Sequence, residues 1–330
     1  MARKIRYGII GFGLFAERAI APAIQTSPNS ELVAIQKRSQ EAAKSKAALH
    51  SIPYAFATAK DLLGSDFVDA VYIASANALH CPETLLAARA RKHILVEKPM
   101  AVNSAQCRRM ISACKKAKVK LMVGHMLRFS PLVHRMRDMV RSGLLGDVRF
   151  ARAEFIFDSR MSQRSWFFDR KLSGGGPSFD VGVHGLDTLQ YVLDDTVISV
   201  KSDLRPRPSK TRTEESANVS LVFSKGTLAS IYSSFVAPIR RTFIEFVGTE
   251  AILSARSFTQ NNTTVTMTLS LPKDGGGEEV KAEQIEIPNL YVDQVTSFSN
   301  SILSNTEPMV GGVVGLENQR VLDAIMRSPK

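Results

Sequence analysis

Cysteine is scarce in this sequence, and long apolar runs are missing. The three cysteines, Cys81, Cys107 and Cys114, are odd in number and fit no metal-binding or disulfide spacing. We therefore expect no metal site and a reducing compartment, the cytoplasm. No apolar run approaches the length of a membrane-spanning helix, so we expect no membrane partner. The short apolar run near the N-terminus is broken by glycines, and we interpret it as a first strand and not as a signal peptide.

Internal repeats and low-complexity tracts are also missing, and the composition is that of an ordinary soluble protein. The 330 residues are 44% hydrophobic and 22% charged, and this length suits two domains. The formal net charge of +12 admits nucleic acid, an anionic surface or a phosphate-bearing ligand as a partner. The densest basic run, residues 115–120, closes a predicted helix, where cations suit the helix dipole. No nucleic-acid-binding pattern accompanies it, so we expect no nucleic-acid partner.

A glycine-rich turn near the N-terminus predicts a dinucleotide-binding domain. It follows the apolar run of residues 4–10 and precedes a helical pattern and a second strand pattern at 31–35. Glycines at such a turn let backbone amides approach a pyrophosphate at the helix N-terminus. The strand–turn–helix context makes the match more specific than an isolated motif. The turn has the pattern G-x-G-x-x-A and consists of Gly11, Phe12, Gly13, Leu14, Phe15 and Ala16.

The end of the second predicted strand has no acidic residue. In NAD-binding domains a carboxylate there accepts hydrogen bonds from the ribose 2′-hydroxyl. This sequence instead has Lys37, Arg38 and Ser39, which would bind a 2′-phosphate through charge-assisted hydrogen bonds. We therefore favour NADP over NAD as the cofactor. The alternative is a solvated basic turn that leads into the helix from Glu41.

Strands and helices continue to alternate up to residue 123. This alternation predicts a doubly wound, mostly parallel α/β sheet, a Rossmann domain, for residues 1–123. Ligands of such a sheet bind at the carboxyl ends of its strands. Two of these ends, after the predicted strands at 69–74 and 93–96, have residues that suit a binding site.

The residues at these two strand ends are candidates for the site. Ser75 and Asn77 follow the first strand, and Glu97, Lys98 and Pro99 follow the second. Lys98 is either a surface charge or a functional cation, and its position alone does not decide between them. Pro99 fixes the turn and would aim the lysine side chain if the bond between the two residues is cis.

The pattern changes in residues 124–330, for which we predict an α+β domain. Alternating apolar segments recur between residues 147 and 271, with few helical patterns between them. Such a run of strands indicates a large, open, mostly antiparallel sheet. Residues 272–281 form a polar turn suited to a hairpin tip, and residues 291–303 and 313–326 are predicted to form closing helices.

The segment LSGGGPSFDVGVHGLD, residues 172–187, predicts a proton-transfer site. Three glycines and a proline make a flexible loop, and a helical pattern begins at Phe179. Asp180 and His184 are four residues apart and Asp187 is three beyond, so all three share one helix face. An acid that orients a histidine beside a substrate is an arrangement suited to proton transfer.

Two interpretations of this predicted helix remain open, one catalytic and one structural. Gly182 and Gly185 leave a strip without side chains, where a ligand or another backbone could come close. The alternative to a catalytic helix is an ordinary buried helix capped by Ser178, in which a neighbouring group satisfies the histidine.

The order of these motifs resembles the glucose–fructose oxidoreductase / inositol dehydrogenase family (Gfo/Idh/MocA). The resemblance spans essentially the whole chain and rests on the glycine-rich turn, the ANALH and EKP segments, and GPSFDVGVHGLD at residues 176–187. It implies a Rossmann domain followed by a domain with a large open sheet. It also implies hydride transfer between NADP(H) and a secondary hydroxyl or carbonyl of a sugar, polyol, inositol or related diol. A homodimer or homotetramer formed through the C-terminal sheet is implied as well.

The same resemblance implies roles for individual residues. Lys98 would lie next to the nicotinamide, orient the substrate oxygen and stabilise its developing negative charge. His184 would take or give the proton, and Asp180 would hold the imidazole and the substrate hydroxyl. The implied cofactor-binding residues are Gly11, Phe12, Gly13, Leu14, Phe15, Ala16, Lys37, Arg38, Ser39, Ser75, Asn77, His80, Glu97 and Lys98.

Weaker candidates and other functions of the family remain open. Arg128, Arg164 and Trp166 are candidates for contacting the substrate, and the predicted substrate-binding residues are Arg128, Trp166, Asp180 and His184. The alternative for each of the first three is packing or a surface ion pair, which we favour for Arg164. An NAD-dependent glycosidase would recycle a tightly bound nicotinamide within each turnover. A catalytically silent sensor would bind the dinucleotide and contact a partner protein.

Overall fold

The computed structural model describes residues 3–159 and 165–327, and the chain divides into two compact units. Each unit combines a long segment with a short C-terminal one: Met1–His125 with Tyr291–Gln319, and Met126–Leu290 with Arg320–Lys330. The sequence predicts a single division after residue 123. The structure differs in that the C-terminal part of the chain returns to the first unit. No helix in the described ranges is long and apolar enough to cross a membrane.

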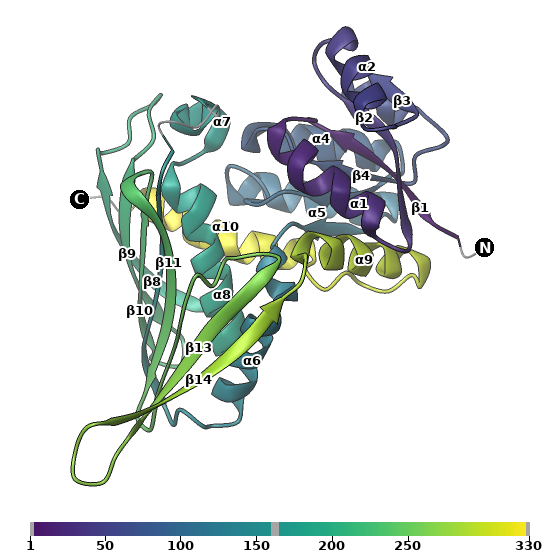
Figure 1. Ribbon diagram of the computed structural model, residues 1–330. Helices are drawn as coiled ribbons and strands as arrows, with labels where there is room; N and C mark the ends of the chain where they lie inside the picture. The colour runs from purple at the N-terminus through teal and green to yellow at the C-terminus, as the bar shows by residue number, and fades with distance from the viewer. Residues whose placement is uncertain (1–2, 160–164, 328–330) are drawn as a thin grey trace. The chain divides into compact units, whose positions relative to one another are not determined.

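The first unit is built on a six-stranded sheet with strand order β3-β2-β1-β4-β5-β6 (Figure 1). All of its strand pairs are parallel. The order reverses between β1 and β4, and this reversal places the ligand crevice of a doubly wound sheet at the carboxyl ends of those strands. The predicted Rossmann sheet is therefore confirmed. The strands are β1 (Ile5–Ile10), β2 (Ser30–Gln36), β3 (Tyr54–Phe56), β4 (Ala70–Ile73), β5 (His93–Val96) and β6 (Leu121–Val123).

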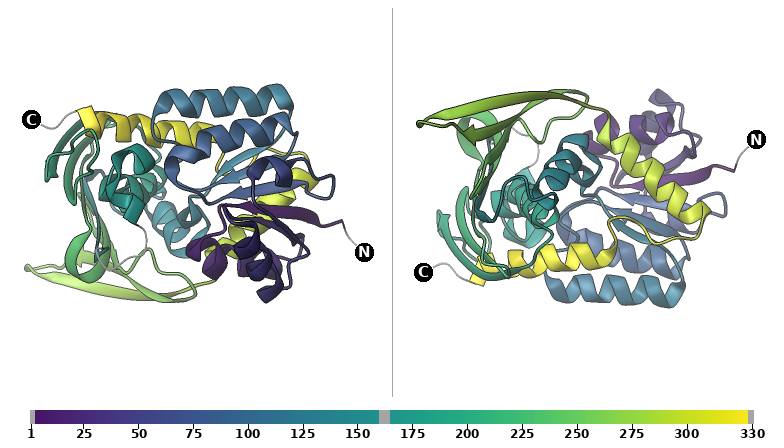
Figure 2. Two further views of the ribbon diagram at one scale, coloured as in Figure 1. Left: turned by 90° about the horizontal axis from the view of Figure 1, so that it is seen from above. Right: turned by 90° about the horizontal axis from the view of Figure 1, so that it is seen from below.

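Helices cover both faces of this sheet. Figure 2 shows α4 and α5 side by side on one face and α1 with α9 on the other. Covering both faces explains why the strands are almost continuously apolar and buried. The helical elements are η1 (Ala16–Ile20), α1 (Ala21–Thr26), α2 (Gln40–Leu49), α3 (Ala59–Leu63), α4 (Asn77–Arg89), α5 (Ser104–Ala117) and α9 (Leu290–Leu303). The helix α10 (Gly312–Arg327) belongs to this unit as far as Gln319 and to the second unit from Arg320.

Buried hydroxyl groups hold α9 on the sheet, although it lies far from the sheet strands in the sequence. The hydroxyls of Tyr7 and Ser30 each lie 2.8 Å from the Ser299 hydroxyl. The hydroxyl of Ser27 lies 2.8 Å from that of Thr296. Because buried polar groups must be paired, these bonds fix where α9 packs. They explain why the segment from Tyr291 belongs to the first unit.

The second unit contains an eight-stranded sheet with strand order β14-β13-β12-β11-β7-β10-β9-β8. Its strands pair antiparallel except β7 and β10, which are parallel, so the predicted open and mostly antiparallel sheet is confirmed. The strands are β7 (Val148–Asp158), β8 (Val197–Arg205), β9 (Ser216–Phe223), β10 (Leu228–Ser234), β11 (Val236–Gly248), β12 (Ile252–Arg256), β13 (Thr263–Pro272) and β14 (Glu278–Ile287). The helical elements are η2 (Met126–Phe129), α6 (Pro131–Arg141), η3 (Ser165–Phe168), α7 (Arg170–Ser173), η4 (Ser178–Gly182) and α8 (Val183–Leu193).

One face of this sheet is covered by α8, which packs closely against β7. A Cβ atom on Gly185 would lie 2.7 Å from the Cβ of Ala153, so the strip of small residues accommodates another backbone. Side chains alternate along β7, and Arg152 and Glu154 therefore point to the opposite face. There Arg152 pairs with Glu245, and Arg241 pairs with Glu154. The polar turn expected at residues 272–281 is shorter than predicted, because β14 already begins at Glu278.

Candidate active site

The glycine-rich turn lies where β1 ends, and its geometry fits a dinucleotide. Gly11 has a φ of +79°, and a Cβ atom on it would lie 2.7 Å from the backbone nitrogen of Ser75, so a side chain does not fit. Gly13 is exposed, and among described atoms a Cβ there would meet only the Gly11 carbonyl oxygen, at 3.8 Å. The open space beside Gly13 is what a pyrophosphate needs to approach the backbone amides.

The basic residues after β2 lie beside this turn. The Nζ of Lys37 donates a 2.9 Å hydrogen bond to the carbonyl oxygen of Phe12 in the turn. Arg38 is exposed, and the Ser39 hydroxyl accepts a hydrogen bond from the first turn of α2. The segment therefore leads into a capped helix, as its structural alternative predicts. It also places Lys37 against the glycine-rich turn, with Arg38 exposed next to it in the chain.

His80 connects the ends of β4 and β5. Its Nδ1 lies 2.9 Å from the carbonyl oxygen of Pro99, and its Nε2 lies 3.1 Å from that of Ser75. Burial lowers the pKa of His80 to about 4, so its imidazole is neutral at pH 7. The sequence predicts a cofactor contact for His80, whereas the structure buries it completely behind the backbone that it holds. Asn77, which is predicted to contact the cofactor near the nicotinamide ribose together with His80, begins α4 and is buried as well.

Lys98 is partly accessible between two buried neighbours. The Lys98–Pro99 peptide bond is cis, which meets the condition under which Pro99 would aim the lysine side chain. The carboxylate of Glu97 accepts a hydrogen bond from the Lys98 amide at 3.2 Å and another from the hydroxyl of Tyr72. Glu97 and Pro99 are buried, whereas Lys98 is half-buried. The lysine is thus the member of the EKP segment that can reach a ligand.

Asp180 and His184 are the accessible pair of an otherwise buried helix. The helix begins as the π-helical turn η4 and continues directly into α8, and such π turns are frequent at functional sites. Within residues 175–189, Asp180 and His184 are half-buried and all other residues are buried. The His184 ring lies against Phe155 of β7, with 6.2 Å between the ring centroids. The acid and histidine selected by their spacing are therefore the two side chains that this segment leaves within reach of a substrate.

Asp187, the second acid expected on this face, has a structural partner. The Nε and Nη2 atoms of Arg128 donate to its carboxylate over 2.9–3.1 Å. The two side chains are 14% and 2% exposed, and the Arg128 guanidinium lies 4.7 Å from the centroid of the Tyr191 ring. Removing one member of such a buried pair leaves an uncompensated charge. For Arg128 the structure thus shows a buried ion pair, whereas the alternative to a substrate contact was a surface ion pair.

Trp166 also has packing partners. It is half-buried, and its ring meets that of Phe167 edge to face at 4.6 Å between the ring centroids. Both belong to an aromatic cluster around Phe235. Packing, the alternative to a substrate contact, is therefore what the structure shows for Trp166. Arg164 lies outside the described residues.

The glycine loop before η4 is closely packed, whereas the sequence predicts a flexible one. A Cβ atom on Gly175 would lie 2.3 Å from the ring of Phe179, and one on Gly176 would lie 2.1 Å from the carbonyl oxygen of Glu214. Both glycines are buried. The residues are small because neighbouring groups occupy the space of their side chains.

Glu214 is a residue of this site that the sequence analysis does not find. It is fully buried, and its Oε1 accepts hydrogen bonds from the amide of Ser178 at 3.2 Å and from the Ser178 hydroxyl at 2.5 Å. A carboxylate at this place suits the positive end of the helix dipole. Glu214 thereby anchors the start of the helix that carries Asp180 and His184. No motif marks it, because it lies 36 residues beyond Ser178 in the chain.

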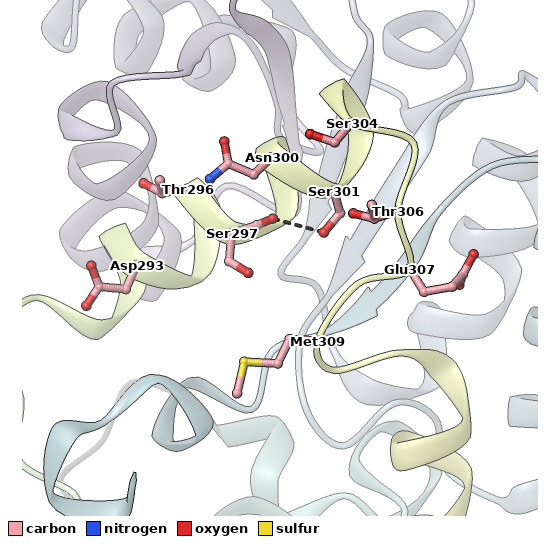
Figure 3. A pocket seen from close by; sticks show the side chains of 9 residues that line it. All are labelled: Asp293, Thr296, Ser297, Asn300, Ser301, Ser304, Thr306, Glu307 and Met309. Atoms are coloured by element: carbon pink, nitrogen blue, oxygen red, sulfur yellow. Dashed lines mark hydrogen bonds between the residues drawn. The ribbon is translucent and has the colours of Figure 1, made fainter.

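A polar groove of about 490 Å³ runs along α9, and none of the predicted site residues lines it (Figure 3). Its size therefore does not make it the candidate active site. No group of three or more histidine, cysteine or acidic side chains in the described ranges could hold a metal ion. The groove is lined by Asp293, Thr296, Ser297, Asn300, Ser301, Ser304, Thr306, Glu307 and Met309.

Comparison with known proteins agrees with this geometry. Two family models match the chain: the oxidoreductase family with an NAD-binding Rossmann fold over residues 5–125, and the GFO/IDH/MocA C-terminal domain over residues 133–254. The chain belongs to the Gfo/Idh/MocA family. The predicted resemblance is thereby confirmed, and with it the oxidoreductase class.

Similar members of the Gfo/Idh/MocA family act on sugars according to their names. The chain is 30% identical to the 1,5-anhydro-D-fructose reductase of Ensifer adhaerens over 94% of this chain and 92% of that protein. It is 28% identical to the D-xylose 1-dehydrogenase [NADP(+)] of Haloarcula marismortui over 97% and 90% of the two chains. The crystal structure of aldose-aldose oxidoreductase from Caulobacter crescentus has a TM-score of 0.87 and 32% identity, covering 99% of this chain and 97% of that one.

Proposed function

We propose that this chain is an NADP-dependent oxidoreductase that transfers a hydride between NADP(H) and a secondary hydroxyl or carbonyl of a sugar, polyol, inositol or related diol. The observation that carries the proposal is the accessible pair Asp180 and His184 on an otherwise buried helix. The partly accessible Lys98 at a strand end of the Rossmann sheet supports it. The sugar-active relatives support the substrate class.

The proposed chemistry divides into a hydride and a proton. A bound nicotinamide supplies acceptance or return of the hydride. In oxidation, His184 takes the proton of the substrate hydroxyl, because imidazole acts as a base near neutral pH. The Lys98 ammonium stabilises the negative charge that builds up on the oxygen as this proton leaves. Asp180 orients the imidazole and the substrate hydroxyl, and in reduction His184 returns the proton.

The choice of NADP rests on the end of β2. Lys37 and Arg38 place two positive charges there, next to the glycine-rich turn, and no carboxylate follows the strand until Glu41. A 2′-phosphate gains charge-assisted hydrogen bonds from such a segment. The D-xylose dehydrogenases among the relatives are named for NADP(+), which supports the same choice.

We also propose that the chain forms a homodimer or homotetramer through the open face of the eight-stranded sheet. That face carries the Arg152–Glu245 pair, and Tyr232 on β10 is 40% exposed. The family resemblance points to this face as the contact surface between copies of the chain. Placement in the cytoplasm, supported by three cysteines that form no disulfide, completes the proposal and is tested by cell fractionation.

A substrate panel with a lysine variant tests the function. Nicotinamide absorbance is followed with aldoses, polyols, inositols and dihydrodiols, with NADP and NAD in parallel. We expect turnover with NADP, and we expect Lys98→Ala to lower kcat by about 100-fold or more while NADPH still binds. Lys116→Ala, which removes an exposed lysine of α5, is the matched control and should leave turnover unchanged.

The outcomes separate the remaining functions. Full activity of Lys98→Ala would disprove the role of this lysine. Cleavage of glycosides without net NADPH formation would indicate a glycosidase. NADPH binding without turnover of any substrate would indicate a sensor.

A further inference from the structure

A chain of buried hydrogen bonds leads from α9 to the backbone of Lys98. The Nε2 of Gln294 donates a 3.2 Å hydrogen bond to the hydroxyl oxygen of Tyr72. That hydroxyl donates in turn to Oε1 of Glu97. The other carboxylate oxygen, Oε2, accepts the amide hydrogen of Lys98 at 3.2 Å. Three segments far apart in sequence, α9, β4 and the end of β5, thus meet at one carboxylate.

Because these hydrogen bonds are buried, the loss of any one of them is costly. Tyr72 and Gln294 are fully buried and Glu97 is 8% exposed, so water does not readily replace a lost partner. A buried carboxylate is costly unless donors surround it. Burial, followed by the charge of Glu97, raises the pKa of Tyr72 well above its ordinary value of 10. The hydroxyl therefore keeps its proton and donates to Glu97 at every physiological pH.

The hydrogen bonds also have a direction. Gln294 can only donate through its NH₂ group, and a hydroxyl that accepts from it has its own proton left for the carboxylate. A carboxylate is acceptor-only when ionised, so it accepts from both Tyr72 and the Lys98 amide. This order of donors and acceptors holds the plane of the Glu97 carboxylate and, through it, the backbone at Lys98.

We propose that Tyr72 and Gln294 are positioning residues for hydride transfer, because together they hold the carboxylate that fixes the backbone from which Lys98 extends. The inference rests on the proposed function, in which Lys98 stabilises charge on the substrate oxygen. A lysine that is displaced from that oxygen loses transition-state stabilisation, whereas the binding of the cofactor at the glycine-rich turn is unaffected.

The chain offers a matched control for the loss of the tyrosine hydroxyl. Tyr7 is also fully buried, lies in a strand of the same sheet, and bonds to Ser299 of the same helix α9. Tyr7→Phe therefore removes a buried hydroxyl and one of several bonds to α9 without touching Glu97. Tyr72→Phe removes an equally buried hydroxyl that does touch it.

The test compares these two variants in turnover. We expect Tyr72→Phe to lower kcat about tenfold, which corresponds to about 1.4 kcal/mol, with an unchanged dissociation constant for NADPH. The observed primary isotope effect with deuterated NADPH should increase, because a slower hydride transfer limits turnover to a greater extent. Tyr7→Phe should leave kcat, the dissociation constant for NADPH and the isotope effect unchanged. Gln294→Met, which removes the first donor of the series, should also lower kcat. It replaces Tyr72→Phe in the comparison if that variant does not fold.

A second readout does not need turnover. The rate at which a lysine-specific reagent modifies Lys98 is measured by peptide mass mapping in both variants. We expect this rate to change in Tyr72→Phe and to stay at the wild-type value in Tyr7→Phe. Equal labelling and equal kcat in the two variants would overturn the positioning role. A wild-type protein without turnover, but with the labelling difference, would contradict the proposed function and leave the positioning of Lys98 standing.

Discussion

Glu83 should make a contribution of its own to the pH dependence of the first unit's stability. This residue lies on α4 and reaches back to Ser75, whose hydroxyl donates to its Oε2 at 2.5 Å. Burial raises the pKa of Glu83 from 4.5 to about 7, and the hydrogen bond from Ser75 only partly opposes this effect. The folded protein therefore holds a proton on Glu83 in a pH range where the unfolded chain has lost it.

The sign and size of the effect follow from these two pKa values. Because the folded pKa is the higher one, the stability contributed by protonated Glu83 is fully present below pH 4.5 and is lost as the pH rises through about 7. A tenfold change in proton affinity corresponds to about 1.4 kcal/mol, so the loss amounts to about 3 kcal/mol at most. Glutamine cannot ionise, and its carbonyl can still accept from Ser75. Glu83→Gln should therefore be more stable than the wild type at pH 8.5 and nearly equal to it at pH 5.

Urea unfolding between pH 5 and pH 8.5, followed by circular dichroism, measures this difference. For a unit of this size, each kcal/mol corresponds to about 2–4 °C in melting temperature, which gives a second readout. Glu31→Gln, at an exposed position of β2, is the control and should show no such pH dependence. A stability difference between Glu83→Gln and the wild type that is constant over this range would refute the reasoning.

Two further predictions concern the cofactor and the assembly. Arg38→Ala should raise KM for NADP about tenfold or more and leave KM for NAD unchanged, because a hydrogen bond to a charged group contributes about 1.5–3 kcal/mol. An equal rise in KM for both cofactors in steady-state assays would show that Arg38 does not bind the 2′-phosphate. Light scattering should give the mass of a dimer or tetramer for the wild type and a smaller mass for Tyr232→Asp on the open sheet face. A monomeric wild type would contradict the proposed assembly.

The sequence predicts the Rossmann sheet well because its signals are local. The glycine-rich turn and the alternation of strands and helices each lie within a few dozen residues, and they indicate a doubly wound, mostly parallel sheet. The return of α9 to this sheet has no local signal. It depends on hydrogen bonds such as those from Ser27 and Tyr7, whose partners lie 269 and 292 residues away. Pairing of this kind is visible only in three dimensions.

In the candidate site, too, the sequence predicts what depends on local spacing and misses what depends on long-range contacts. The spacing of Asp180 and His184 is enough to select them, because helix geometry relates residues four apart. Spacing alone also suggests Asp187, but the structure pairs that acid with Arg128, which lies 59 residues earlier. Glu214 could not be selected, since a buried carboxylate looks like any other acid in the sequence.

Strand β14 is missed for a different reason. Most of its residues are exposed on both faces of the β13–β14 hairpin, so it lacks the period-two apolar pattern by which strands are recognised. Its pairing with β13 is continuous from Glu278 to Ile287, and backbone hydrogen bonds define it. The alternating apolar pattern of a strand arises from the burial of one of its faces, and few side chains of β14 are buried.

Transfer of label from the cofactor to the sugar tests the central claim most directly. The wild-type protein is incubated with the carbonyl substrate that the panel selects and with NADPH that carries deuterium at both C4 positions of the nicotinamide. The product is analysed by mass spectrometry and NMR. We predict one deuterium on the carbon of the new hydroxyl group, and formation of this labelled product at least about 100-fold more slowly when Lys98 is replaced by alanine. Product without deuterium, or bound NADPH with no reduced product from any sugar, polyol, inositol or diol-derived carbonyl, would contradict the account.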